Sequence, residues 1–204
     1  AIFYMLDIFP GTRLYEAYLK RSGQSDDIWL KPMEGIAYFE TDADLDHATV
    51  TAFGDHLRQT FYRHLADYVE AIELVDLPEL KALQADFLSR MAMTFDHGDY
   101  AGIADIDHRE ACAASLYQRS LQYHDNARAY LGLGIGRQKA GEYTDSIRIL
   151  TRGVERFPDE VQLAICLAIS LINVGDYSGA LERLSRFAQD QNAAELIARC
   201  RMAM

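Results

Sequence analysis

The feature that most constrains the fold is an internal repeat in the second half of the chain. Residues 127–160 and 161–194 align without gaps, so the repeat has a period of 34 residues. In each copy four positions recur at i, i+3, i+4 and i+7, which is the spacing of one helical face. The matched positions are Tyr130, Leu133, Gly134, Arg137, Ser146, Leu150 and Pro158 in the first copy, and Ala164, Leu167, Ala168, Leu171, Ala180, Leu184 and Asn192 in the second.

Each copy predicts two helices joined by a tight turn. "GEY" at 141–143 and "GDY" at 175–177 supply the turn, because Gly141 and Gly175 can adopt the left-handed dihedrals that end a helix. Pro158 ends the second helix, since proline cannot continue it. One helix pair cannot bury its own apolar face, so neighbouring pairs must stack. The predicted fold is mainly α, a solenoid of helix-turn-helix repeats.

These motifs resemble the tetratricopeptide repeat, whose pattern has a large residue, Leu-Gly, a second large residue, Ala, an aromatic residue and Pro at the same spacings. Arg137 departs from the usual aromatic residue and Ser146 from the usual alanine. The resemblance implies a scaffold that holds a protein or peptide partner in a groove lined by the first helix of each repeat. The implied groove residues are Arg128, Leu131, Ile135, Gln138 and Lys139 in the first repeat, and Gln162, Ile165, Ile169, Ile172 and Asn173 in the second.

The second repeat carries an additional apolar row beside its packing stripe. The row consists of Val161, Ile165, Ile169 and Ile172. A helix that is apolar on both sides is buried on both sides. Either another helix of the chain covers the row, such as a capping helix at 192–204 or the upstream helices, or an amphipathic helix of a partner does. In the second case Arg128 and Lys139 would attract the acidic end of that partner.

A degenerate repeat is expected at 78–126, and it would begin a repeat domain at 76–204. A helix at 78–96 leads into "HGDY" (97–100), which predicts the same turn, and a second helix follows at 113–124. The insertion between them contains four possible metal ligands, Asp105, Asp107, His108 and Glu110. We interpret Asp107 and Glu110 as a capping box in a solvated loop, with a divalent cation as the alternative. Asn192 and Glu195 predict a second capping box, which would open the terminal helix.

The first third of the chain, residues 1–75, has a different pattern. Residues 1–9 form a short apolar run typical of a buried strand, and 34–41 predict a second strand. Pro10 and Gly11 predict a turn, and Thr12 caps a helix at 13–21. Further helices are expected from Asp44 or Asp46 onward and at 64–74. The opening strand lacks partners within this chain, so we expect it to pack on the helix at 46–62, to pair with a second molecule in self-association, or to fray.

The stretch "MLDIFPGTRLYEAYLKRSG" resembles the end of the catalytic barrel in radical S-adenosylmethionine enzymes, especially those with an upstream cobalamin-binding domain. The resemblance implies that this chain is the C-terminal region of a longer enzyme. That parent would use S-adenosylmethionine and a [4Fe-4S] cluster, together with cobalamin if it has the upstream cobalamin-binding domain, and Pro10, Gly11 and Thr12 would lie at its cofactor site. The family's C-x3-C-x2-C run does not occur here, so the chain by itself is expected to be non-catalytic and to bind no cofactor or metal. The alternative is a free-standing tetratricopeptide adaptor.

Composition excludes two classes of partner. The formal net charge is −11, which argues against nucleic acid and anionic membrane surfaces, because phosphate binding needs clustered Lys and Arg. The chain has three well-separated cysteines, Cys112, Cys166 and Cys200, which predict reduced core thiols in a cytoplasmic protein. "GLGIG" at 132–136 lies within a predicted helix, so close helix packing explains it better than a dinucleotide loop.

Overall fold

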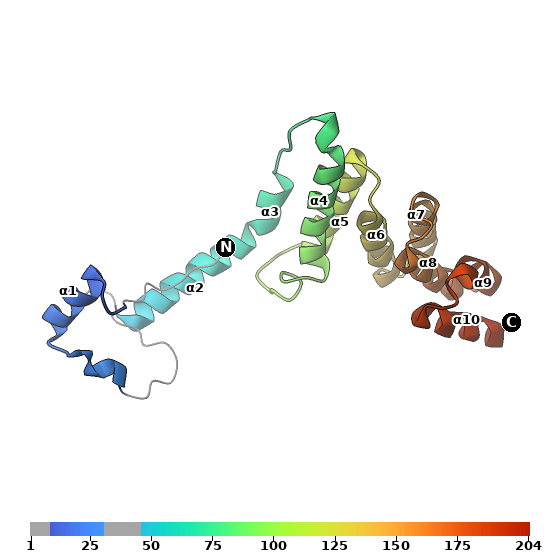
Figure 1. Cartoon of the computed structure of the whole chain (residues 1–204). Helices are drawn as coiled ribbons and strands as arrows, with labels where there is room; N and C mark the ends of the chain where they lie inside the picture. Colours follow the sequence, from blue (N-terminus) through green and yellow to red (C-terminus); the bar gives the residue numbers. More distant parts are fainter. Residues whose placement is uncertain (1–8, 31–45) are drawn as a thin grey trace. The chain divides into compact units, whose positions relative to one another are not determined.

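The computed structural model describes residues 9–30 and 46–204 and divides the chain into two compact units, Ala1–His64 and Leu65–Met204. The described residues form ten α-helices and three short 3-10 helices, and they contain no strand (Figure 1). The prediction of a mainly α fold is therefore confirmed. The strands predicted at 1–9 and 34–41 lie, apart from Phe9, outside the described residues.

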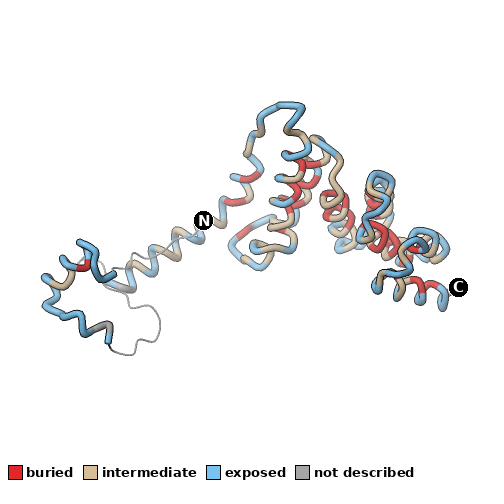
Figure 2. Tube along the Cα trace, in the orientation of Figure 1, coloured by how far each residue is buried: buried red, intermediate tan, exposed pale blue. Residues whose placement is uncertain are grey.

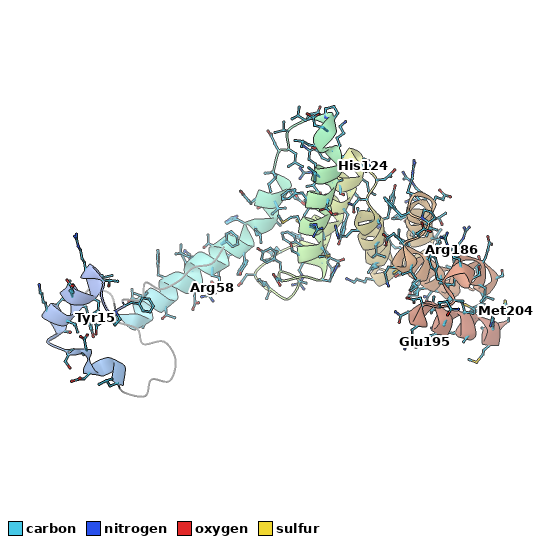
Figure 3. All side chains as sticks on the ribbon, viewed as in Figure 1. Tyr15, Arg58, His124, Arg186, Glu195 and Met204 are labelled. Carbon is cyan, nitrogen blue, oxygen red and sulfur yellow. The ribbon has the colours of Figure 1, made fainter. Side chains whose placement is uncertain are left out.

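The first unit contains two capped helices. Helix α1 (Arg13–Ser22) follows a turn in which Gly11 has φ 82°, and the Tyr15 backbone N–H donates to Thr12 Oγ1 at 3.2 Å. Tyr15, labelled in Figure 3, is buried and donates its hydroxyl to Asp26 Oδ1 at 2.7 Å, at the start of the 3-10 helix Asp26–Leu30. Helix α2 (His47–Arg63) is capped by Asp46. The turn and the Thr12 and Asp46 caps are thus confirmed.

The second unit is a series of helices in which α3 packs on α5 and, from α4 on, each helix packs on the next (Figure 1). Its α-helices are α3 (Leu65–Glu70), α4 (Lys81–Asp96), α5 (Arg109–Tyr123), α6 (Ala127–Lys139), α7 (Tyr143–Arg156), α8 (Val161–Asn173), α9 (Tyr177–Leu184) and α10 (Gln191–Ala203). The 3-10 helices Pro78–Leu80 and Ser185–Phe187 precede α4 and follow α9. Figure 2 shows that the buried residues of this unit run through helices α4 to α10. Arg186, labelled in Figure 3, donates to Asp159 in the α7–α8 connection.

Two of the three predicted glycine turns have the expected conformation. Gly141 has φ 75° and Gly175 has φ 85°. After α6, the Glu142 N–H donates to Arg137 O and the Gly141 N–H to Gln138 O, both at 2.9 Å. The turn after α8 repeats this bonding pattern, which is the Schellman motif. Pro158 follows Phe157, the C-cap residue of α7, so the helix ends just before the proline, as predicted.

The structure corrects three local predictions. The chain turns at "HGDY" after α4, but Gly98 has no positive φ and its N–H donates to Met93 O, so this turn lacks the left-handed glycine of the other two. Helix α5 begins at Arg109 after His108, whose φ is 53° and which makes no side-chain cap, so the Asp107–Glu110 capping box is wrong. Helix α10 begins at Gln191, because the side chain of Asp190 accepts from the Ala193 N–H at 3.0 Å. The predicted cap at Asn192 is therefore also wrong.

Small residues bring α5, α6 and α7 close together. A Cβ atom on Gly132 would lie 2.2 Å from the Tyr117 ring, and one on Gly134 would lie 2.5 Å from the Leu150 side chain. Both contacts leave room only for glycine. The interpretation of "GLGIG" as a close-packing segment of a helix is confirmed at these two positions.

Candidate functional site

The implied groove residues at the two ends of α6 form ion pairs with α4. Arg128 donates from Nη1 to Asp86 Oδ1 at 2.8 Å and to Ser89 Oγ at 3.2 Å. Lys139 Nζ donates to Asp96 Oδ1 at 2.7 Å. The two cations expected to attract a partner's acidic end therefore already have acidic partners within this unit.

Gln138 connects α6 to α8 through a polar network. Its Nε2 donates to Cys166 O and to Ser170 Oγ, both at 2.7 Å. Ser170 Oγ lies 2.9 Å from Ser146 Oγ, and the Ser146 hydroxyl is also 2.9 Å from Gly134 O. Both serines are fully buried. The serine that replaces the usual alanine at 146 thus has hydrogen-bond partners on α6 and α8.

The three implied groove isoleucines of α8 pack in or against a core cluster to which α10 contributes. Ile165 and Ile172 are buried in a cluster with Ala193, Ile197 and Cys200 of α10. Ile169 is half-buried and packs against the same cluster. The apolar row could be covered by another helix of the chain or by a helix of a partner. At Ile165 and Ile172 the structure shows the first of these.

The other implied groove residues keep part of their surface exposed. Leu131 and Ile135 of α6 are half-buried, and Leu131 packs on the core around Leu150. Gln162 and Asn173 of α8 are exposed. A half-buried aliphatic row thus remains on α6.

The turn at 10–12 is exposed and forms a local hydrogen-bonded cap. The Thr12 hydroxyl donates to Phe9 O at 2.8 Å and accepts from the Tyr15 N–H. Across residues 9–30 and 46–204, no three His, Cys, Asp or Glu side chains lie close enough to hold a metal ion. No helix in this part of the chain is long and apolar enough to cross a membrane.

The three cysteines are unpaired and lie on separate helices, α5, α8 and α10. Cys112 and Cys200 are buried, as predicted for core thiols. Burial, together with the charges of Glu70 and Asp67, raises the pKa of the Cys112 thiol to about 11. This thiol therefore stays protonated and is a poor nucleophile.

A cavity of about 410 Å³ lies where the end of α4, the start of α5 and the end of α6 meet. The sequence pattern did not predict it. Its polar lining consists of Asp96, Glu110, Tyr117, Arg137 and Lys139, and alanines, glycines and Leu133 form the rest. The volume is within the range of small-molecule sites.

Tyr117 is the unusual member of this lining. It is only 1% exposed, and its hydroxyl has no hydrogen-bond partner within residues 9–30 and 46–204. Burial and the nearby charge of Asp96 raise its pKa, while Arg128 opposes the shift, so the phenol is neutral at physiological pH. Sequence periodicity identifies Tyr117 as a core residue of α5, but it cannot show that the hydroxyl lacks a partner.

Asp96 provides a nearly buried carboxylate in the same cavity. Its side chain is 9% exposed, and its two oxygens lie 2.7 Å from Lys139 Nζ and 3.3 Å from His97 Nδ1. Arg137 forms an ion pair with Glu142 at the outer end of α6. The cavity thus contains a carboxylate whose charge Lys139 compensates.

Comparisons with protein-family models, curated proteins and solved structures find no match to this chain.

Proposed function

We propose that residues 76–204 are a tetratricopeptide-type scaffold that binds a protein partner, within the C-terminal region of a radical S-adenosylmethionine enzyme. One observation carries the proposal. Helices α6 and α8 begin at Ala127 and Val161, and α7 and α9 begin at Tyr143 and Tyr177, so both members of the pair recur at the same 34-residue offset. The left-handed glycine between them recurs at that offset too. Such an exact repeat of both helices and the turn is typical of stacked helical repeats.

The partner surface follows from what the chain leaves uncovered. Leu131 and Ile135 of α6 are half-buried. On α4, Leu83 is 67% and Phe87 is 40% exposed, and they lie on one face of this helix at i and i+4; α4 packs on α6, to which Asp86 is paired. Exposed apolar side chains on adjoining helices favour an interaction surface. The polar groove residues would then hold α4, α6 and α8 at their spacing and would not contact the partner. These residues are Arg128, Gln138 and Lys139.

The enzymatic parent is supported by the first unit. The Pro10–Thr12 turn leads directly into a helix that Thr12 caps, which is the arrangement that the resemblance to the barrel end implies. Pro10, Gly11 and Thr12 would lie at the edge of the parent's cofactor site, and the cysteines that hold the cluster would belong to parts of the parent upstream of Ala1. Reading the coding sequence upstream of Ala1 tests this part, because a C-x3-C-x2-C run is required and its absence would leave only the scaffold.

The scaffold is tested with Leu83→Asp and Phe87→Asp in the full chain used as bait for crosslinking and mass spectrometry. We expect both variants to lose the partners that wild type captures, because a carboxylate disrupts an apolar contact. Val174→Asp is the matched control, since Val174 is 49% exposed but lies at the turn after α8. Capture by the two α4 variants at the wild-type level would contradict the proposal, provided that their unfolding curves are unchanged.

A further inference from the structure

The connection between α3 and α4 carries acidic and apolar side chains at one end of the second unit (Figure 1). Residues 70–80 include no lysine, arginine or histidine, and their four acidic residues are spaced three positions apart. All four are exposed, and they are Glu70, Glu73, Asp76 and Glu79. Between them, Val75 is 65% and Leu77 is 41% exposed. The connection therefore combines negative charge with apolar side chains that face water.

Arg119 of α5 holds the first part of this connection in place. Its Nη1 donates to Glu70 O at 2.9 Å, and its Nη2 donates to Ile72 O at 2.6 Å. Both acceptors are backbone carbonyl oxygens. The guanidinium therefore fixes the course of the chain without pairing with a carboxylate.

Gln84 of α4 holds the second part of the connection. Its Nε2 donates to Val75 O, which brings the connection to the start of α4. Leu83 and Phe87 are exposed on one face of that helix, at i and i+4. We call residues 70–80, together with Leu83 and Phe87, the α3–α4 surface.

The four carboxylates of the α3–α4 surface form no ion pair in the part of the chain that the structure describes. Arg119 is bonded to carbonyl oxygens. Arg90 and Arg128 both pair with Asp86. Lys81, the next basic residue in the sequence, forms no ion pair with a described residue either. Uncompensated negative charge beside exposed apolar side chains favours a partner that is both basic and apolar.

From this combination we infer that the α3–α4 surface binds a basic amphipathic segment of a protein partner. Lysine or arginine side chains of that segment pair with Glu73, Asp76 and Glu79, and its apolar side chains cover Val75 and Phe87. The inference rests on the proposed scaffold function and names the chemistry of its partner. The partner's charge is the opposite of the one that the groove residues of α6 implied.

The test is a fluorescence-anisotropy titration of the full chain with two labelled amphipathic peptides. One consists of Leu and Lys, and the other has Glu in place of every Lys. We expect the Lys peptide to bind saturably and the Glu peptide to bind at least about tenfold more weakly, because only the first offers cations to the α3–α4 surface. The triple variant Glu73→Gln, Asp76→Asn, Glu79→Gln should weaken binding of the Lys peptide about tenfold.

The matched control removes the same charge elsewhere in the second unit. It is the triple variant Asp99→Asn, Asp105→Asn, Asp107→Asn in the connection between α4 and α5, where all three residues are exposed. Its affinity for the Lys peptide should stay within about twofold of wild type, because the α3–α4 surface is intact. Phe87→Ser, which adds no charge, should weaken binding about fivefold through the loss of apolar contact.

Three results would each overturn the inference. They are equal binding of the two peptides, no saturable binding of the Lys peptide, and equal losses in the two triple variants, which would show attraction by net charge alone. The scaffold proposal is tested separately by the capture experiment with Leu83→Asp and Phe87→Asp. Loss of capture there, together with any of these three results, would mean that a partner without a basic segment binds at α4.

Discussion

At the scale of single residues, Tyr117 and Tyr130 form a matched pair. Both are almost fully buried, at 1% and 2% exposure. The Tyr130 hydroxyl donates to Asp125 Oδ1 at 2.6 Å, whereas that of Tyr117 has no partner in the part of the chain that the structure describes. The same chemical change at the two positions should therefore have opposite effects on stability.

We expect Tyr117→Phe to leave the free energy of unfolding unchanged or to raise it by about 1 kcal/mol, because it removes a buried, unsatisfied hydroxyl. Tyr130→Phe should lower that free energy by about 1–2 kcal/mol, since it removes a hydrogen bond to a carboxylate. Urea unfolding curves measure both changes. Equal losses for the two variants would mean that the Tyr117 hydroxyl is bonded after all.

Asp86 is the residue that gives the α4–α6 contact a pH dependence. Hydrogen bonds from Arg90 and from Arg128 lower the pKa of its carboxyl below the ordinary value of 3.8. Since the folded-state pKa is depressed, this stabilisation is complete above 3.8 and is lost as the pH falls through the folded-state pKa. The Asp86→Asn variant should therefore unfold at a lower urea concentration than wild type at about pH 6. When the pH is lowered to about 3, its unfolding midpoint should fall less than that of wild type.

The control for Asp86→Asn is Asp145→Asn. Asp145 pairs with Arg148 at i,i+3 on the surface of α7, at 3.2 Å. Because that pair lies within one helix and is exposed, its loss should change stability at about pH 6 by only a few tenths of a kcal/mol. An Asp86→Asn variant as stable as the control would show that the ion pair does not hold α4 to α6.

At the scale of elements, the glycines of α6 separate helix packing from helix propensity. Gly134→Ala should lower the free energy of unfolding by about 1–3 kcal/mol, because the new Cβ would lie 2.5 Å from Leu150, whose side chain is fully buried. Gly136→Ala should raise it by about 0.5–1 kcal/mol, since nothing lies near the added atom. Thermal unfolding followed by circular dichroism measures both. If both variants raised the free energy of unfolding, α6 and α7 would be able to move apart without loss of stability.

At the scale of the whole molecule, α10 closes the helical series of the second unit. It contributes Ala193, Ile197 and Cys200 to the cluster that buries Ile165 and Ile172. Deleting 191–204 should expose these isoleucines, lower the unfolding midpoint and promote association, because apolar side chains that α10 buries would then face water. Deleting only 202–204 is the control, since these three residues are exposed and their loss should change nothing. Sedimentation velocity and urea unfolding compare the two deletion variants. A variant without 191–204 that stays monomeric and as stable as wild type would contradict the role of α10 as a cover.

The sequence by itself determined the helix pairs of 127–184 and their turns. The 3.6-residue periodicity, the glycines at 141 and 175 and Pro158 are local signals, and the structure has helices and turns where they predict them. Thr12 and Asp46 were predictable as caps for the same reason. Local signals failed at α5 and α10. There Asp107 and Asn192 have capping chemistry, but the helices begin after His108 and Asp190.

Only the tertiary structure decided which side chains of α6 and α8 meet other helices. Arg128 and Lys139 pair with Asp86 and Asp96, which lie 42 and 43 positions earlier in the chain. No helical periodicity encodes contacts at that separation, because a repeat pattern fixes the face of a helix but not the residues opposite it. The cover that α10 gives to Ile165 and Ile172 and the unpartnered Tyr117 hydroxyl arise in the same way. Both depend on how three helices pack together, which is a property of the assembled unit.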